Sequence, residues 1–260
     1  MKASNSPLSH MIARLRTAQP QAAPYPHYFL DGFFPDKYYR ALLQHLPGAG
    51  AYRNLFEITS LKLEHFQFRE QRDLSDGWTQ DLPAEMKNFW EQFNTWLFSP
   101  ALAQAVLESF AGPLRARFGA ADHWPEVRVE AQLIRHRAGF FLQPHSDLHT
   151  KLIVLLIYLP ADASAAHLGT SLYRPRRPGF SCARSLHHPF EDFIKVDTAP
   201  FKPNSLLAFE RSDRSFHGLE PLSPEDTARC HRDLIQYVIY DKAAREAQLR
   251  VRRAAESRQR

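Results

Sequence analysis

The chain has 260 residues, of which 44% are hydrophobic and 23% are charged, a composition that fits one globular domain and excludes a disordered chain. The formal charge of +5 falls entirely within residues 242–260, so residues 1–241 are formally neutral and a nucleic-acid-binding body is not expected. The two cysteines form no disulfide framework, and the amino-terminal residues lack the apolar core of a signal peptide. The longest apolar run, Leu152–Leu159, is too short to span a membrane. We therefore expect a cytoplasmic protein without membrane contact.

The amino-terminal part is expected to be a flexible leader followed by a helix. Residues 1–23 are mostly polar and end in a stretch of Pro, Ala and Gln, which predicts a leader without fixed structure. An aromatic, strand-like segment then precedes a helix that should begin at Pro35 or Asp36. Proline and glycine at Pro47-Gly48 should stop this helix.

Residues 83–118 show the periodicity of helices. Apolar and aromatic side chains recur there every three or four positions, namely Met86, Phe89, Trp90, Phe93, Trp96 and Leu97. A second helix is predicted to begin after Pro100 and to end before Gly119. We interpret the aromatic stripe as core, so that residues 24–120 form a helical support for the rest of the domain.

From residue 121 the pattern changes to short β-like segments. They are about five to ten residues long and are bounded by Pro, Gly, Asn or Ser. Such strands predict a sandwich or jelly roll over residues 121–241, so that residues 24–241 form one domain that is mainly β with helical support. Residues 242–260 have a basic, helix-forming composition. We interpret them as a solvated helix or tail, with contact to nucleic acid or acidic lipid as the less favoured alternative.

A His-X-Asp tripeptide at 145–147 could supply two ligands to iron. A non-haem Fe(II) oxygenase requires two imidazoles and one carboxylate on one face of the metal, and alternate residues near a strand end point the same way. The tripeptide alone is a weak signal, because roughly one match is expected by chance and a second occurs at 231–233. The second match also resembles the start of a protein-kinase catalytic loop, but Val238 stands where that loop requires Asn, which excludes a kinase.

The order of the segments around the first tripeptide is more specific. In chain order these are His136 and Gly139, the pair His145 and Asp147, an apolar strand from Lys151 that ends in Tyr-Leu, a Gly-Thr-Ser-Leu-Tyr element, a Pro-led strand that ends at Phe209, His217-Gly218, and a last strand from Arg232. In this order they resemble the 2-oxoglutarate oxygenase superfamily, specifically its prolyl-hydroxylase-like branch. The resemblance covers roughly residues 124–241.

This resemblance implies a double-stranded β-helix (jelly roll) core that binds Fe(II) and uses 2-oxoglutarate and O2 as cosubstrates. It implies that His145, Asp147 and His217 are the catalytic iron ligands. It also implies that Arg232 binds the distal carboxylate of 2-oxoglutarate, a role that suits the bidentate fork of a guanidinium. Arg229 is an alternative for this role, although we interpret it as an ordinary surface charge.

Several residues near these motifs have two interpretations each. His136 stands where the branch often has a Tyr that helps to hold the cosubstrate, and it could bind 2-oxoglutarate or pack in the core. Lys151 could face the pocket or solvent, and we favour solvent; Tyr173 could be either core or pocket lining. Three histidines are expected in loops near the substrate entrance: His149, His187 and His188. Three arginines could meet an anionic substrate or form a solvated turn: Arg174, Arg176 and Arg177.

The predicted activity is hydroxylation of an unactivated C–H bond in a small metabolite, with succinate and CO2 as coproducts. Asp147 favours this outcome over halogenation, because the related halogenases replace that carboxylate with a small residue. Desaturation and ring formation by the same chemistry stay open. So do hydroxylation of a protein side chain, a non-catalytic cupin-like binding protein, and a Zn or Mn enzyme on the same scaffold. The helical support could complete a substrate pocket or form a homodimer interface.

Overall fold

The computed structural model describes residues 6–59, 62–75, 77–183, 186–229 and 231–258. The strands are β1 (His27–Asp31), β2 (Arg53–Asn54), β3 (Arg69–Asp73), β4 (Val127–His136), β5 (Leu142–His145), β6 (Lys151–Tyr158), β7 (Thr170–Pro175), β8 (Phe193–Ala199), β9 (Ser205–Glu210), β10 (His217–Leu219) and β11 (Arg232–Asp241). The helices are α1 (Pro7–Arg16), α2 (Asp36–Gln44), α3 (Leu55–Ile58), α4 (Ala84–Leu97), α5 (Pro100–Ser109), α6 (Ala111–Phe118), α7 (Pro224–Arg229) and α8 (Lys242–Arg258). Within the described residues, none of these helices has the length and apolar character needed to cross a membrane.

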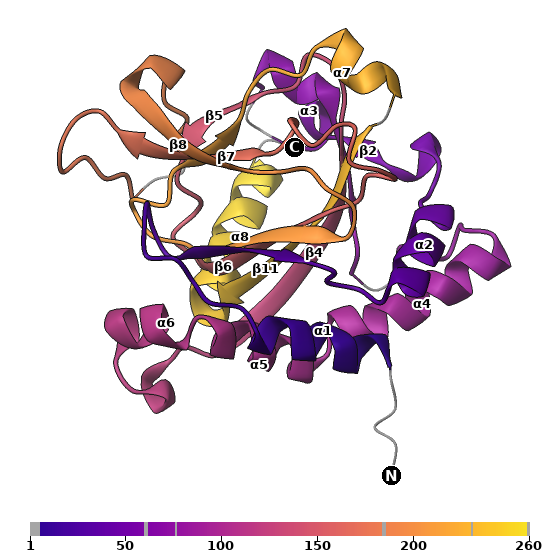
Figure 1. Cartoon of the computed structure of the whole chain (residues 1–260), viewed down its shortest axis with the longest axis horizontal. Coiled ribbons are helices and arrows are strands. Elements are labelled where there is room, and N and C mark those ends of the chain that lie inside the picture. The colour runs from indigo at the N-terminus through magenta and orange to yellow at the C-terminus, as the bar shows by residue number, and fades with distance from the viewer. Residues whose placement is uncertain (1–5, 60–61, 76, 184–185, 230, 259–260) are drawn as a thin grey trace.

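Two antiparallel sheets form the centre of the molecule (Figure 1). The larger sheet has the strand order β1-β9-β6-β11-β4-β3-β2, and the smaller one has the order β5-β10-β7-β8. From β4 to β11 the chain passes back and forth between the sheets, and only β7 and β8 follow one another within the same sheet. This alternation is the winding expected of a double-stranded β-helix, and the predicted mainly β fold with helical support is confirmed.

After Lys151, strand β6 is apolar from Leu152 to Tyr158, because both faces of the larger sheet are covered. Ile153 and Ile157 point to the core that the sheet shares with the helices. Val154 and Leu156 point the other way, into the core between the two sheets. The continuous apolar sequence of β6 is therefore explained by burial on both faces.

Helix α1 corrects the prediction of a flexible leader. The side chain of Ser6 caps this helix by accepting a hydrogen bond from the backbone N–H of Ser9, and Pro7 occupies its first turn. Met11 and Leu15 are fully buried, and α1 packs against α5. The leader prediction is wrong for α1, because its apolar side chains recur at helical spacing and bury one face. Residues 1–5 lie outside the described part of the chain.

The other predicted helices and most predicted strands are confirmed. The helix expected from Pro35 or Asp36 is α2, and the periodic region 83–118 divides into α4, α5 and α6. Trp90 and Phe93 from the aromatic stripe are fully buried, as a core role requires. The sequence does not predict β2 and β3, which extend the larger sheet, because β3 (REQRD) has no apolar alternation.

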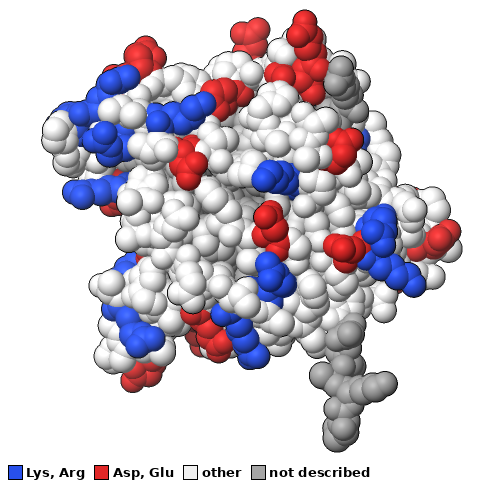
Figure 2. Space-filling model, viewed as in Figure 1, with Lys and Arg blue, Asp and Glu red and all other residues white. Residues whose placement is uncertain are grey.

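The basic carboxyl-terminal segment forms α8, as predicted, and its first turns are docked on the larger sheet. Arg245 forms an ion pair with Glu130 of β4 at 2.5 Å, and Lys242 pairs with Glu126 at 2.9 Å. Elsewhere, Figure 2 shows Lys and Arg side chains gathered at the upper left, near the end of β7 and β8. Three exposed arginines lie at the end of β7 and just after it: Arg174, Arg176 and Arg177.

Gly169 lies where the β7 and β8 ends approach each other too closely for a side chain. A Cβ atom at this position would stand 2.0 Å from the backbone oxygen of Ala199. We expect Gly169→Ala to lower the free energy of unfolding by about 2 kcal/mol, because the backbone must shift to relieve the overlap. Urea denaturation measures this change. Gly48→Ala is the control, since nothing lies within 4 Å of its Cβ position, and equal effects of the two substitutions would contradict the explanation.

Candidate active site

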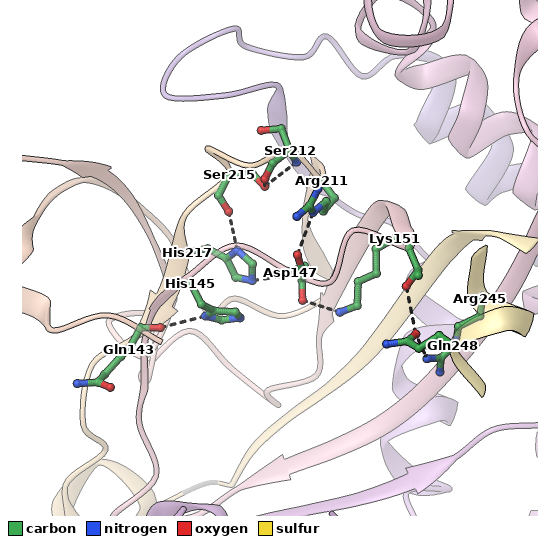
Figure 3. A network of polar contacts seen from close by, with 11 residues as sticks. Gln143, His145, Asp147, Lys151, Arg211, Ser212, Ser215, His217, Arg245 and Gln248 are labelled. Atoms are coloured by element: carbon green, nitrogen blue, oxygen red, sulfur yellow. Dashed lines mark hydrogen bonds and ion pairs between the residues drawn. The ribbon is translucent and has the colours of Figure 1, made fainter. Parts of the chain in front are cut away.

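His145, Asp147 and His217 meet beside the smaller sheet (Figure 3). His145 ends β5 and His217 begins β10, and the two residues are cross-strand partners whose ring centroids are 4.4 Å apart. Asp147 follows β5, and its Oδ2 lies 3.6 Å from the Nε2 atom of His217. One possible ligand atom from each of the three residues lies within 4.8 Å of the other two. The structure thus brings together the three residues predicted as metal ligands.

Backbone carbonyls fix the orientation of both imidazoles. The Nδ1–H of His145 donates to the carbonyl oxygen of Gln143, and the Nδ1–H of His217 donates to that of Ser215, each over 3.0 Å. Because a carbonyl can only accept, Nδ1 carries the proton and the lone pair is left on Nε2. Burial lowers the pKa of both histidines, so both are neutral, as metal ligands must be.

Asp147 presents one paired and one unpaired carboxylate oxygen. Its Oδ1 accepts a hydrogen bond from the Nζ of Lys151 at 2.6 Å. Burial alone would raise the pKa of Asp147, but the charge and hydrogen bond of Lys151 hold it below the usual range. Oδ2 is buried and has no hydrogen-bond donor among the described residues. A buried carboxylate oxygen without a partner is costly, and two imidazole nitrogens with one such oxygen form a donor set that suits Fe(II).

The prediction that Lys151 faces solvent is wrong. A β-bulge lies between β6 and β11, where Tyr240 pairs with Lys151 although Ile239 pairs with Ile153. Leu152 is the extra residue of the bulge and has no partner in β11, so it points to the same core as Ile153. Lys151 is thereby turned to the opposite face of the sheet, which lines the inner cavity. The Lys151 side chain is buried there against Asp147.

The three candidate metal ligands, His145, Asp147 and His217, line an inner cavity of about 200 Å3 between the two sheets. Further polar residues in its lining are Arg69, His136, Lys151, Thr170, His187, Arg232 and Gln236. Apolar lining comes from Phe66, Ile134, Phe140, Leu142, Leu156, Leu219 and Leu234. The cavity therefore joins the candidate metal ligands to several cationic groups within an otherwise apolar wall.

Arg232 lies inside this cavity, as its predicted role requires. The residue is 2% exposed, and its Nε donates to the carbonyl oxygen of Leu168 at 2.6 Å while Nη2 donates to Thr170 at 2.9 Å. No carboxylate contacts its guanidinium among the described residues. Burial lowers the pKa of Arg232 to about 10, which leaves the group charged at neutral pH. The chain thus holds a buried, oriented cation without an anionic partner.

His136 lies next to Arg232, because the two residues are cross-strand partners in β4 and β11. Its Nδ1 accepts a hydrogen bond from Nη1 of Arg232 at 2.9 Å, so the proton resides on Nε2. Nε2 is buried and has no partner among the described residues. The ring also stacks on Phe140, so His136 packs in the core and presents a free N–H to the cavity.

The protonation of His136 predicts a pH dependence of stability. Burial and the neighbouring Arg232 and Arg69 hold its pKa well below the ordinary value, whereas in the unfolded chain it titrates near ~6.5. Because the pKa of His136 is depressed in the folded state, the contribution of neutral His136 to the free energy of unfolding is complete above the unfolded-state pKa. This contribution is lost as the pH falls below that value. Below pH ~6 the metal-free wild type should lose up to about 1.4 kcal/mol per pH unit more than His136→Gln. Urea denaturation at several pH values measures this difference, and parallel pH profiles would contradict it.

Most other sequence candidates lie away from the inner cavity. The Tyr173 hydroxyl contacts Glu220, and its ring packs with Phe193 and Phe216 in a separate cluster, so its role is core. Among the three loop histidines, only His187 lines the cavity, with its ring 5.0 Å from that of His145. The residues outside the lining are His149, His188, Arg174, Arg176 and Arg177. The side chain of Arg229 lies outside the described residues.

The second His-X-Asp tripeptide has a structural explanation. His231 is exposed, whereas Asp233 is buried and accepts two hydrogen bonds from Arg135, each at 2.8 Å. This bidentate pair occupies both carboxylate oxygens of Asp233. The carboxylate of Asp233 is therefore committed to Arg135, and among the described residues the group placed to hold a metal is that of His145, Asp147 and His217, so the tripeptide at 231–233 is not a second metal site.

Comparison with known proteins gives a likeness of fold. No family model matches the chain, and neither does any curated protein sequence. The chain is similar to the structure of a prolyl hydroxylase from Trichoplax adhaerens in complex with a hypoxia inducible factor oxygen degradation domain peptide fragment. The TM-score is 0.54 and the sequence identity is 12%, over 92% of this chain and 91% of that chain. A prolyl-4-hydroxylase from Pseudomonas putida aligns with a TM-score of 0.47 and 14% identity over 91% of this chain and 99% of that chain. The first likeness shows that this chain has the fold of a prolyl hydroxylase.

Proposed function

We propose that this chain is an Fe(II)- and 2-oxoglutarate-dependent oxygenase that hydroxylates an unactivated C–H bond of a small metabolite. One observation supports this function most strongly: a single cavity contains three convergent metal-ligand atoms and the buried cation of Arg232. The first feature suits a divalent metal with open coordination positions. The second suits the distal carboxylate of a dicarboxylate cosubstrate.

Each residue has a distinct role in this proposal. His145 and His217 hold Fe(II) through Nε2, and Asp147 holds it through Oδ2, while Lys151 keeps the Asp147 carboxylate ionised. The bound iron supplies the redox chemistry that activates O2. The reaction balances as one C–H bond, O2 and 2-oxoglutarate giving one C–OH group, succinate and CO2.

Arg232 and its neighbours orient the cosubstrate and shield it. Three of the five N–H groups of Arg232 donate to Leu168, Thr170 and His136, which fixes the guanidinium and leaves two N–H groups for a carboxylate. The free Nε2–H of His136 is a further donor beside them. The burial of Arg232 and His136 strengthens these charge-assisted bonds, because the local dielectric is lower than in water.

The size of the inner cavity favours a small substrate. Its volume of about 200 Å3 lies below the roughly 300–1,000 Å3 of common ligand pockets, and the cosubstrate must share it. Only a small molecule or one end of a larger one fits beside the cosubstrate. The second candidate is hydroxylation of a protein side chain, which the likeness to a prolyl hydroxylase in complex with a peptide fragment favours.

Anaerobic reconstitution tests the proposed chemistry. The purified chain is loaded with Fe(II), titrated with 2-oxoglutarate under visible absorption spectroscopy, and then exposed to O2 while succinate is measured. We expect saturable 2-oxoglutarate binding, and succinate formation that needs Fe(II), 2-oxoglutarate and O2 together. A cupin-like binding protein would release no succinate, and a Zn or Mn enzyme would not need O2. Failure of the iron-loaded chain to bind 2-oxoglutarate would overturn the proposal.

A further inference from the structure

Arg69 is a second arginine that faces the inner cavity. It begins β3, where it is the cross-strand partner of His136 in β4, and His136 is in turn the partner of Arg232 in β11. Residues paired in this way point to the same face of a sheet, so the three side chains form a row across the cavity wall. Arg69 lies at the β3 end of the row, and Arg232 lies at the other end.

The guanidinium of Arg69 has no partner within the described part of the chain. Its Nε is buried without an acceptor, and no hydrogen bond or ion pair joins the side chain to any described residue. The neighbouring arginines are engaged, since Arg72 donates to the carbonyl oxygen of Trp78 and Arg137 pairs with Glu70. An unpaired cation in a largely buried position is costly. The structure therefore holds Arg69 ready for an anion that is not part of the chain.

The charge of the inner cavity also calls for a second anion. Its described lining contains the cations Arg69, Lys151 and Arg232, and Asp147 is the sole acidic residue there. Fe(II) and the 2-oxoglutarate dianion carry equal and opposite charges, so their binding leaves this excess of positive charge in place. Lys151 is paired with Asp147, and Arg232 is assigned to the cosubstrate. The positive charge of Arg69 is therefore left without a compensating anion.

We propose that the primary substrate is a small organic acid whose carboxylate is bound by Arg69. This inference rests on the proposed oxygenase function. A guanidinium fork binds a planar carboxylate through two parallel hydrogen bonds, and the surrounding wall of Phe66, Phe140 and Leu142 suits a short apolar chain. The small cavity places the acid group close to the carbon that is hydroxylated. The exposed arginines at the end of β7 and just after it, which the sequence offers for an anionic substrate, lie outside this cavity.

Binding of simple acids and their amides tests the role of Arg69. The probes are the straight-chain carboxylates from propanoate to hexanoate, each with its primary amide, titrated by calorimetry into the anaerobic Fe(II)-loaded chain saturated with 2-oxoglutarate. We expect at least one acid to bind at least tenfold more tightly than its amide. Arg69→Gln should abolish this preference and change the 2-oxoglutarate dissociation constant by less than threefold. Arg69→Lys, which keeps the charge without the fork, should retain part of it.

Two comparisons keep the result interpretable. Arg53→Gln removes an exposed arginine from the adjacent strand β2, outside the inner cavity, and should leave acid and cosubstrate binding unchanged. The melting temperature of Arg69→Gln should be no lower than that of the wild type, because the substitution removes an unpaired charge. If the Arg69→Gln variant does not fold, Arg69→Met is used in its place.

Three outcomes would overturn the inference. If wild type binds 2-oxoglutarate but no acid better than its amide, the substrate class is wrong. If Arg69→Gln weakens 2-oxoglutarate binding as strongly as Arg232→Ala does, Arg69 is a cosubstrate anchor instead. If the wild type fails to bind 2-oxoglutarate at all, the proposed function falls and this inference falls with it.

Discussion

His217→Ala is expected to weaken Fe(II) binding by more than about 100-fold and to abolish succinate formation. The substitution removes one of the three convergent ligand atoms, whereas loss of a partner that merely orients a ligand already weakens metal binding by about 10- to 100-fold. His217 is cross-strand paired through its backbone, so β10 should still form. Equilibrium dialysis of Fe(II) against the metal-free chain measures the affinity, and succinate release in the presence of 2-oxoglutarate and O2 measures the turnover.

The second tripeptide supplies a matched control for this substitution. His231→Ala removes the exposed histidine of the second His-X-Asp tripeptide, and it should change neither Fe(II) affinity nor succinate formation. A His217→Ala chain that binds Fe(II) as tightly as the wild type would exclude His217 as a ligand. Similar losses in both variants would show that the metal lies elsewhere.

The site residues that sequence could predict are those held by strand-end geometry. His145 and Asp147 stand two positions apart where β5 ends, and His217 follows a strand that the sequence also predicts. The tripeptide alone does not distinguish this pair from 231–233. The difference lies in a distant residue, because Arg135 occupies both oxygens of Asp233 whereas no protein group occupies Oδ2 of Asp147.

The residues that sequence analysis places wrongly or omits depend on interactions between distant segments. Lys151 is turned inward by a bulge that forms only when β6 pairs with β11. Arg69 enters the cavity because β3 adds to the edge of β4, and neither the polarity nor the spacing of REQRD indicates a strand. Such pairings of remote segments leave no periodic pattern within either segment.

Helix α1 is a different case, because its signal is local. Met11 and Leu15 stand four positions apart after a Ser-Pro start, which is an ordinary helix beginning with an apolar stripe. The polar composition of residues 1–23 as a whole hides this stripe. Average polarity is therefore a poorer guide to order than the spacing of the few apolar side chains, which here bury fully against the helical layer.

Arg232→Ala is expected to raise the dissociation constant of 2-oxoglutarate by roughly 100-fold. Truncating one partner of a buried, hydrogen-bonded charge pair costs about 2–5 kcal/mol, and about 3 kcal/mol corresponds to roughly 100-fold in affinity. Fe(II) affinity should change little, because Arg232 is not among the three clustered ligand residues. Anaerobic titration of the Fe(II)-loaded variant with 2-oxoglutarate measures the first quantity, and equilibrium dialysis measures the second.

Arg229→Ala separates the two arginines that the sequence offers for this role. Arg229 ends α7, before β11, whereas Arg232 begins β11 and is buried within the lining of the inner cavity. The Arg229 variant should therefore bind 2-oxoglutarate within about twofold of the wild type, in the range of an ordinary surface charge. Equal weakening by both substitutions would refute the assignment of Arg232. If Arg232→Ala weakened 2-oxoglutarate binding and Fe(II) binding to the same extent, Arg232 would stabilise the whole cavity and would not anchor the cosubstrate in particular.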